Sequence, residues 1–432
     1  MGVVRPVRAT AVLVLLGALG VTGCSSTATP DPGTGTTPDP SASPGPAEDA
    51  TAGDGSGTDT DTDTDTDDAG TAGGGATEDA PTTGGTTVDP AVPPELDVEV
   101  VLDGLAIPWD VAPRPDGTVL VTERGGRLLA HRDGRTQEVA TDLDHLFASG
   151  EAGLLGLAVE EDTVYLCHAW APPDGPGDVR VTAHTLAEDL TSATLQDVVV
   201  DGIPLTSGRH SGCRLLLQDD GTLLVGTGDA ADEANPQDLD SLGGKVLHVR
   251  TDGGAADPGS APPGADPRIL TYGHRNVQGL AEQPGTGEIF SVEHGPAVDD
   301  EVNVLEPGAN YGWAPGPGYD EGVPMTDLER FPDAVEAVWS SGDPTHATSG
   351  AAFLEGEAWG AWEGALAVAE LKGSGMTVLT LDGREVVDEA RVPELEGSYG
   401  RLRSVVLDDD GALWVTTSNG SDDVVLRVTP RG

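Results

Sequence analysis

A short turn-and-strand unit recurs six times after residue 115. Each copy has a tight turn, then a strand of apolar or β-branched residues, then polar or glycine-rich residues where the strand ends. The copies lie roughly 45 to 80 residues apart, which suits one four-stranded blade with extended loops. We therefore predict an all-β fold, a six-bladed β-propeller. The copies begin at Asp116, Asp162, Asp220, Thr286, Gly364 and Asp410.

The predicted propeller spans residues 96–432. An irregular β-sandwich is the structural alternative, but sandwiches rarely need so many residues or show so regular a unit. We expect the strand around residues 96–102 to complete a blade begun at the C-terminus. This closure would remove exposed strand edges.

The N-terminus has the pattern of a bacterial lipoprotein signal peptide, residues 1–23. Arg5 and Arg8 precede an apolar run that ends at Gly23-Cys24. Cys24 would then be the lipidated first residue of the mature protein, which predicts an extracytoplasmic protein anchored to the cell membrane through this residue. An ordinary cleaved secretory signal and a short membrane helix are the alternatives, although the apolar run is short for a span.

Residues 24–95 are rich in Ser, Thr, Pro, Gly and Asp, and they include an alternating Thr-Asp run over residues 58–67. Such a composition cannot bury a core, so we predict a disordered tether. A calcium-binding loop is the alternative, but the run lacks the turn glycine and terminal Glu of an EF-hand.

The formal net charge of −52 argues against nucleic acid as a partner and against direct adhesion to anionic lipid. The membrane contact that we expect is the lipid anchor alone. With Cys24 lipidated, Cys167 and Cys213 remain as a pair. A disulfide between them and two buried free thiols both stay open.

Polar residues stand at the predicted strand ends of several units, and in a propeller such ends converge around the central channel. The segment from Tyr272 to Trp313 combines the cation Arg275 and the amide Asn276 with acidic residues around a Gly295-Pro296 turn. A guanidinium can hold a carboxylate, and hard oxygen atoms can hold calcium. The residues expected to meet in one pocket are Glu151, His210, Arg275, His294, Lys372, Arg401 and Arg403.

From about residue 98 to 430 the chain resembles the soluble pyrroloquinoline quinone (PQQ) dependent sugar dehydrogenases of the glucose and sorbosone type. The resemblance is carried by IPWDVAPRPDGTVLVTERGGRL from Ile107, GEAGLLGLAV from Gly150, HSGCRL from His210, LLVGTGDAAD from Leu223, SLGGKVLHV from Ser241, YGHRNVQGLA from Tyr272, EHGPAVDDEVNVLEPGANYGW from Glu293 and YGRLRSVV from Tyr399. It implies a six-bladed propeller that oxidises aldose sugars, with PQQ and calcium as cofactors and an external electron acceptor.

The resemblance also implies roles for individual residues. It assigns PQQ contacts to Arg275, Asn276, Lys372, Arg401 and Arg403, while a structural ion pair is the alternative for each arginine. His294 is expected to line the cofactor pocket, and Glu151 to contact the quinone or the substrate.

Two calcium sites follow from the same resemblance. Gly295 and Pro296 match residues whose backbone carbonyls bind the cofactor's calcium. Asp300, Glu301 and Tyr311 match a second, structural calcium cluster. A solvated acidic turn is the alternative for this second set.

His210 matches the catalytic base, because an imidazole can take the proton of a sugar hydroxyl near neutral pH. The chain departs from the glucose enzymes at Glu151, where they carry Gln, and at Arg209 and Ser418, where Asp is expected. It also lacks room for their dimer-forming insertions, so we expect a monomeric aldose dehydrogenase. A calcium-dependent propeller lactonase or hydrolase and a non-catalytic binding propeller are the competing functions.

Overall fold

The computed structural model describes residues 91–431. The predicted signal peptide 1–23, the lipidation site Cys24 and the predicted tether, apart from residues 91–95, lie outside the described residues, so these interpretations stay predictions. Within the described part, one short 3-10 helix, η1 (Glu357–Trp362), accompanies the strands. The prediction of an all-β fold is confirmed.

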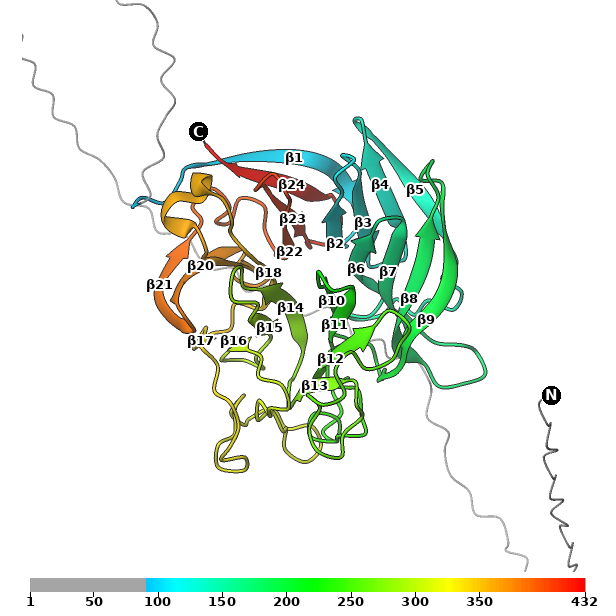
Figure 1. Ribbon diagram of the computed structural model, residues 1–432, viewed down its shortest axis with the longest axis vertical. Helices are drawn as coiled ribbons and strands as arrows, with labels where there is room; N and C mark the ends of the chain where they lie inside the picture. The colour runs from blue at the N-terminus through cyan, green and yellow to red at the C-terminus, as the bar shows by residue number, and fades with distance from the viewer. Residues whose placement is uncertain (1–90, 432) are drawn as a thin grey trace, which may run out of the picture. The chain divides into compact units, whose positions relative to one another are not determined.

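The strands form antiparallel groups of four (Figure 1). In three groups, neighbouring strands are also consecutive in the sequence. These groups are β10 (Arg214–Leu217) to β13 (Ile269–Tyr272), β14 (Val277–Glu282) to β17 (Trp339–Ser340), and β18 (Thr348–Phe353) to β21 (Glu385–Arg391). The strands between these bounds are β11 (Thr222–Gly226), β12 (Lys245–Arg250), β15 (Ile289–Glu293), β16 (Glu301–Val304), β19 (Leu366–Glu370) and β20 (Gly375–Asp382).

An eight-stranded sheet consists of two further antiparallel halves. The two halves are joined where β5 and β9 run parallel, with Ala140 opposite Ser192. Its strands are β2 (Pro108–Pro113), β3 (Val119–Glu123), β4 (Leu128–Arg132), β5 (Arg135–Thr141), β6 (Leu154–Glu160), β7 (Thr163–Trp170), β8 (Asp178–Leu186) and β9 (Ser192–Pro204).

The two ends of the described chain meet in the remaining sheet. Strand β1 (Leu96–Leu105) pairs with β24 (Asp423–Pro430), with Leu96 opposite Pro430, and β23 (Leu413–Thr417) and β22 (Leu402–Leu407) complete the order. The expected pairing of the first strand with the C-terminal strand is therefore confirmed. Because strands β2, β6, β10, β14, β18 and β22 contact one another in succession and β22 contacts β2, the sheets surround a common centre (Figure 1).

The recurring Asp-Gly turn has a local cause. Asp116 Oδ1 accepts the backbone N–H of Thr118 at 2.9 Å, and Gly117 adopts a φ of 80° that favours glycine. Asp220 repeats the contact with the N–H of Thr222, also at 2.9 Å. This turn chemistry sets the start of β3 and β11, whose apolar side chains are buried between neighbouring sheets.

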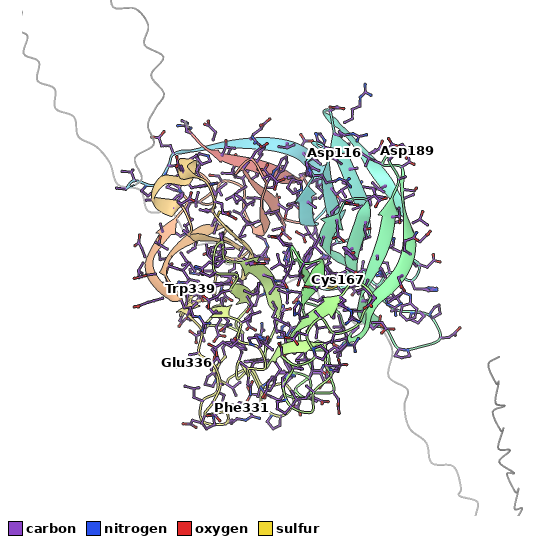
Figure 2. The ribbon with its side chains drawn as sticks, in the orientation of Figure 1. Asp116, Cys167, Asp189, Phe331, Glu336 and Trp339 are labelled. Atoms are coloured by element: carbon purple, nitrogen blue, oxygen red, sulfur yellow. A yellow bond between two sulfur atoms is a disulfide. The ribbon has the colours of Figure 1, made fainter. Side chains whose placement is uncertain are left out.

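Cys167 on β7 and Cys213, directly before β10, form a disulfide across two neighbouring groups of strands (Figure 2 labels Cys167). Their Cα atoms lie 5.8 Å apart, and both residues are fully buried in the largest apolar cluster. Of the two alternatives left open by the sequence, the structure shows the disulfide. It holds the segment that precedes β10 against β7.

Over residues 91–431, no helix has the length and apolar character that a bilayer crossing requires.

Candidate active site

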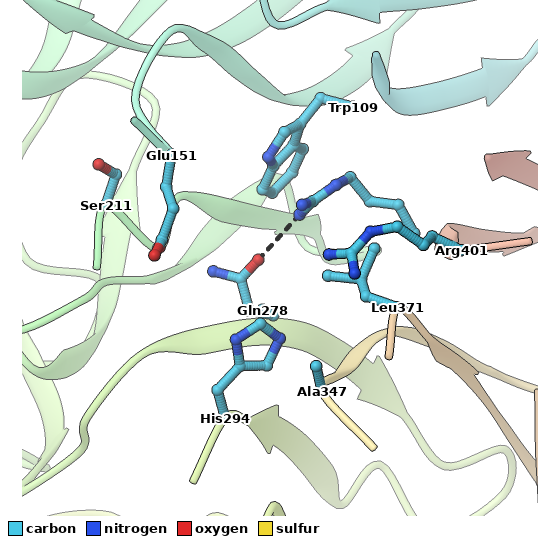
Figure 3. A pocket seen from close by; sticks show the side chains of 10 residues that line it. Trp109, Glu151, Ser211, Gln278, His294, Ala347, Leu371 and Arg401 are labelled. Atoms are coloured by element: carbon cyan, nitrogen blue, oxygen red, sulfur yellow. Dashed lines mark hydrogen bonds between the residues drawn. The ribbon is translucent and has the colours of Figure 1, made fainter. Parts of the chain in front are cut away.

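A cavity of about 240 Å³ lies among the ends of the innermost strands (Figure 3). All six groups of strands contribute to its wall, either from the innermost strand or from the segment next to it. Four residues predicted for the site, Glu151, His294, Arg401 and Arg403, line it. The other lining residues are Trp109, Ser211, Gly212, Gln278, Ala347 and Leu371.

Arg401 and Arg403, which are two residues apart, both reach this cavity (Figure 3 labels Arg401). Arg401 precedes β22, and the register of β22 against β23 shifts between Leu402 and Val405. Side chains two residues apart in an extended segment point to the same side, which accounts for the shared position of the two arginines. The structure therefore places both cations on the cavity wall.

Arg403 is held in place by neutral partners. Its Nη1 donates to Gln278 Oε1 at 3.1 Å, the dashed line in Figure 3, and its Nε donates to Ser418 Oγ at 3.3 Å. Its guanidinium carbon lies 5.5 Å from the ring centre of Trp109, which Arg214 also approaches at 4.4 Å. Burial, and then Arg214, lower the pKa of Arg403 to about 9. The charged form is costly here and would be stabilised by a bound anion.

His294 adds to the positive wall. Burial, followed by the nearby Arg275, Arg403, His210 and Arg401, holds the pKa of its imidazole well below the ordinary value. Its Nε2 is buried, and no residue in the described part of the chain donates to it or accepts from it. A neutral imidazole with an unpartnered nitrogen at a cavity wall is suited to a hydrogen bond with a ligand.

His210 lies directly before the lining residues Ser211 and Gly212, and its side chain is almost fully buried. Its Nδ1 is 2.8 Å from Asp229 Oδ1 and 2.9 Å from the hydroxyl of Tyr319. Because the carboxylate must accept, we assign the proton of the neutral ring to Nδ1. Nε2 is then left as a proton acceptor, as a general base requires.

Both carboxylate oxygens of Asp229 accept further hydrogen bonds, which fix its side chain. Oδ1 accepts the N–H of Ala231 at 2.8 Å, and Oδ2 accepts Trp313 Nε1 at 2.8 Å and the Tyr319 hydroxyl at 2.7 Å. A base, an orienting carboxylate and supporting donors are thus assembled from four separate segments.

Arg275 and Asn276 support the site and do not line the cavity. Arg275 donates through Nε and Nη2 to Glu321 Oε1, at 3.0 and 2.6 Å, and through Nη1 to the carbonyl of His294 at 2.9 Å. Asn276 Nδ2 donates to Glu151 Oε2 at 3.2 Å, and the same Glu151 oxygen accepts the N–H of His210 at 3.1 Å.

Lys372 is exposed and also lies outside the cavity lining. Its Nζ donates to Thr345 Oγ1 at 3.3 Å, and its backbone N–H donates to the carbonyl of His346. The neighbouring Leu371 lines the cavity, so Lys372 stands at the rim.

The residues predicted for the structural calcium site have separate partners. Asp300 Oδ1 accepts the N–H of Gly295 at 2.9 Å, and its Oδ2 accepts the N–H groups of His346 and Ala347, both at 2.6 Å. Glu301 accepts from Asn303 and Thr326, whereas the Tyr311 hydroxyl donates to the carbonyl of Val304 at 2.6 Å.

No three His, Cys, Asp or Glu side chains within residues 91–431 converge as metal ligands. Burial and the nearby Glu293 raise the pKa of Glu301 to about 8, so this pair of carboxylates favours a cation or a shared proton. Gly295 and Pro296, expected to act through backbone carbonyls, form a turn that Asp300 anchors through the Gly295 N–H.

Sequence reasoning missed several residues of this site. Trp109 and Asp229 lie inside motifs that carried the resemblance, IPWD and VGTGD, but neither received a role. Tyr319 and Glu321 belong to a Gly- and Pro-rich stretch that shows no pattern pointing to a site. The partner of Tyr319 is 90 positions away, so only the fold reveals the contact.

The chain is similar to known proteins over most of the described region. The family model described as Glucose / Sorbosone dehydrogenase matches residues 105–426. The aldose sugar dehydrogenase YliI of Escherichia coli K12 is 31% identical over 358 residues, covering 79% of this chain and 95% of its own. The protein slr1608 of Synechocystis is 32% identical over 391 residues, covering 83% of this chain and 92% of its own.

Among solved structures, the PQQ-bound form of an aldose sugar dehydrogenase from Streptomyces coelicolor superposes with a TM-score of 0.64. It is 32% identical to this chain, and the match covers 79% of this chain and 100% of that one.

Proposed function

This chain belongs to the glucose/sorbosone dehydrogenase family and is an oxidoreductase of the quinoprotein glucose dehydrogenase type, and we propose that it oxidises aldose sugars to lactones with PQQ as its cofactor. The observation that carries this proposal is the pairing of a cation-lined cavity with an oriented histidine. Arg401 and Arg403 line the cavity, and His210 with Asp229 stands beside it.

The residues present fit PQQ. The cofactor is flat and has three carboxylates, and it would meet the guanidinium groups of Arg401 and Arg403, the free Nε2 of His294 and the indole of Trp109. Lys372 at the rim and Arg275 behind the wall add positive charge. Bound PQQ supplies the two-electron oxidant that receives hydride from C1 of the sugar.

His210 is the general base in this proposal. Its Nε2 takes the proton of the anomeric hydroxyl as C1 loses hydride, and the sugar leaves as the lactone. Asp229 and Tyr319 keep the Nδ1 proton in place, so that the imidazole presents the same nitrogen in each turnover. Glu151, which accepts the N–H of His210, fixes the backbone of the base and contacts the cofactor or the sugar.

Calcium is proposed as the second cofactor. The carbonyls of Gly295 and Pro296 would hold the cation next to PQQ, in a turn whose position Asp300 sets through the Gly295 N–H. The second calcium site is proposed at Asp300, Glu301 and Tyr311. Its support is that the buried carboxylates of Glu293 and Glu301 converge on the Nδ2 of Asn303, at 3.1 and 3.4 Å, and a cation would relieve this charge pair.

The wider organisation is also proposed here. Each four-stranded group is one blade of a six-bladed propeller over residues 96–432, carried on a disordered tether, residues 24–95, with the signal peptide 1–23 removed and Cys24 lipidated. In this arrangement the enzyme is an extracytoplasmic monomer that passes electrons to a separate acceptor.

Reconstitution tests the function. Purified protein is loaded with PQQ and calcium, and reduction of an artificial dye is followed with a panel of aldoses. Dye reduction that needs both PQQ and an aldose supports the proposal. Hydrolysis of lactones with calcium alone would favour the hydrolase, and PQQ binding without dye reduction would favour a binding module.

A further inference from the structure

The stretch from residue 314 to 322 packs against the base. Gly316 and Asp320 exchange both backbone hydrogen bonds, at 2.7 and 3.0 Å, which closes a small hairpin. At its tip, the Tyr319 hydroxyl reaches Asp229 and His210, and the Tyr319 N–H donates to Glu233 Oε2 at 3.0 Å. This hairpin is therefore anchored beside the catalytic pair on two sides.

Glu321, at the end of this hairpin, bridges two arginines. Its Oε1 accepts Nε and Nη2 of Arg275, and its Oε2 pairs with Nη2 of Arg209, the residue directly before the base. Burial opposes ionisation of Glu321, but Arg209 and Arg275 outweigh it and lower its pKa. Glu321 therefore carries a full negative charge at neutral pH.

Glu321 and the carbonyl of His294, which accepts from Nη1, together engage all three nitrogens of Arg275, and the Glu321 carboxylate balances its charge. Arg209 stacks over the Tyr319 ring, with its guanidinium carbon 5.2 Å from the ring centre. Without the Glu321 carboxylate, two converging guanidinium groups beside the base would form a strong subsite for a carboxylate ligand.

We propose that Glu321 is a specificity-determining residue: it occupies Arg209 and Arg275 and so makes the sugar site select neutral aldoses over aldoses that carry a carboxylate, the uronic acids. An acidic sugar at the base finds the positive charges of Arg209 and Arg275 already balanced by Glu321, and it meets the carboxylates of Glu321 and Glu151. The proposal rests on the aldose dehydrogenase activity proposed above, and it names the substrate class of that site.

The test compares D-glucose with D-glucuronate on the PQQ-loaded enzyme. The ratio of kcat/KM for glucuronate to that for glucose should be low in the unmodified protein and should rise about tenfold or more in Glu321→Gln, which keeps a hydrogen-bonding group but removes the charge. A ratio that changes by less than about twofold would overturn the proposal. PQQ affinity, measured by titration, shows whether each variant still loads.

Glu233→Gln is the matched control. It weakens the contact to the Tyr319 N–H but leaves the Glu321 bridge in place. The sugar ratio should stay as in the unmodified protein. If Glu233→Gln raises the ratio as much as Glu321→Gln does, the position of the hairpin sets specificity and the charge of Glu321 does not.

A second variant, Arg209→Gln, tests the proposal if Glu321→Gln folds poorly. Arg209 is largely exposed, and Arg209→Gln leaves Glu321 with one arginine and a more negative site. The ratio should then fall, and an increase would contradict the proposal. Calorimetry of both sugars on reduced, anaerobic holoenzyme gives dissociation constants without turnover. If no aldose reduces the dye, the proposed function fails, while the calorimetric ratio still decides the role of Glu321.

Discussion

His210 Nδ1 lies 2.8 Å from Asp229 Oδ1, and His210 holds this position with a left-handed backbone, at a φ of 50°. A non-glycine residue in this region is strained, and strain of this kind persists only where the surroundings fix it. Here the His210 N–H donates to Glu151, and the side chain is held by Asp229 and Tyr319. The backbone and the side chain of His210 are thus both held by hydrogen bonds, which fix the direction in which Nε2 points.

Replacement of His210 by Asn should lower turnover by about 10² to 10⁴, because a positioned base contributes a factor of this size. PQQ affinity should stay unchanged. The measurement is the rate of cofactor reduction when the loaded variant meets an aldose in stopped flow. His131→Gln, on the strand pair β4 and β5 and bonded there to Thr136, is the control and should react as the unmodified protein does. A His210→Asn variant that reacts at full rate would remove His210 from the role of base.

Removal of the Tyr319 hydroxyl should have a smaller effect. Tyr319→Phe keeps the ring beneath Arg209 but loses two hydrogen bonds, while Asp229 retains Trp313 and Ala231. We expect kcat to fall about threefold to tenfold, the kinetic equivalent of a typical hydrogen bond, with little change in KM for the sugar. Steady-state kinetics separate the two constants. A rise in KM at constant kcat would show that the hydroxyl binds sugar and does not position the base.

The sequence was sufficient for the all-β class, the pairing of the first and last strands and four of the residues that line the cavity. These depend on local patterns, such as the Asp116-Gly117 turn and the apolar strands that follow it. Strand alternation also places Arg401 and Arg403, two residues apart, on the same side, and both line the cavity. The register shift between β22 and β23 could not be predicted from the sequence, because a bulge reflects pairing with another strand.

The supporting contacts of the site were beyond sequence reasoning for a similar reason. Glu321 pairs with Arg209, 112 positions away in the sequence, and with Arg275, 46 positions away. Taken alone, each is an ordinary charged residue in an acidic protein. The contacts of Asp300 were equally out of reach. Its oxygens accept backbone N–H groups that tie the Gly295 turn to residues 346 and 347, and the calcium role that the resemblance implies for it stays a prediction.

Loss of the disulfide should destabilise the fold. Cys167 and Cys213 are 46 positions apart, so the bond closes a long loop, and replacing both with Ala should lower the free energy of unfolding by about 2 to 4 kcal/mol. Urea unfolding of variant and unmodified protein gives this difference. The reducing agent dithiothreitol should shift the midpoint of the unmodified protein only, and an equal shift in the variant would show that the effect does not come from this bond.

The buried His168 on β7 should make the fold sensitive to acid. Burial lowers its pKa to about 4 from 6.5, and the neighbouring His184 and Arg180 act in the same direction. Between these two values the unfolded chain binds a proton that the native protein does not. Stability should therefore fall as the pH drops from about 6.5 to about 4, by up to about 3 kcal/mol from this residue.

Replacing His168 with Gln checks this result. The free energy of unfolding, measured by urea at about pH 7 and about pH 4.5, should fall less with acid in His168→Gln than in the unmodified protein. Parallel losses in the two proteins would assign the acid sensitivity to other groups.

Arg403 should matter more for PQQ affinity than Lys372. Arg403 is buried in the cavity wall, and its charge is opposed by burial and by Arg214, so a bound carboxylate would stabilise it strongly. Lys372 is exposed at the rim, where water screens its charge. In a titration of the metal-loaded protein with PQQ, Arg403→Gln should raise the dissociation constant at least about tenfold, because buried charged hydrogen bonds are worth about 1.5 to 3 kcal/mol. Lys372→Gln should raise it less. If Lys372→Gln has the larger effect, the cofactor is held at the rim, and the cavity lined by Trp109 and Arg403 is not its main site.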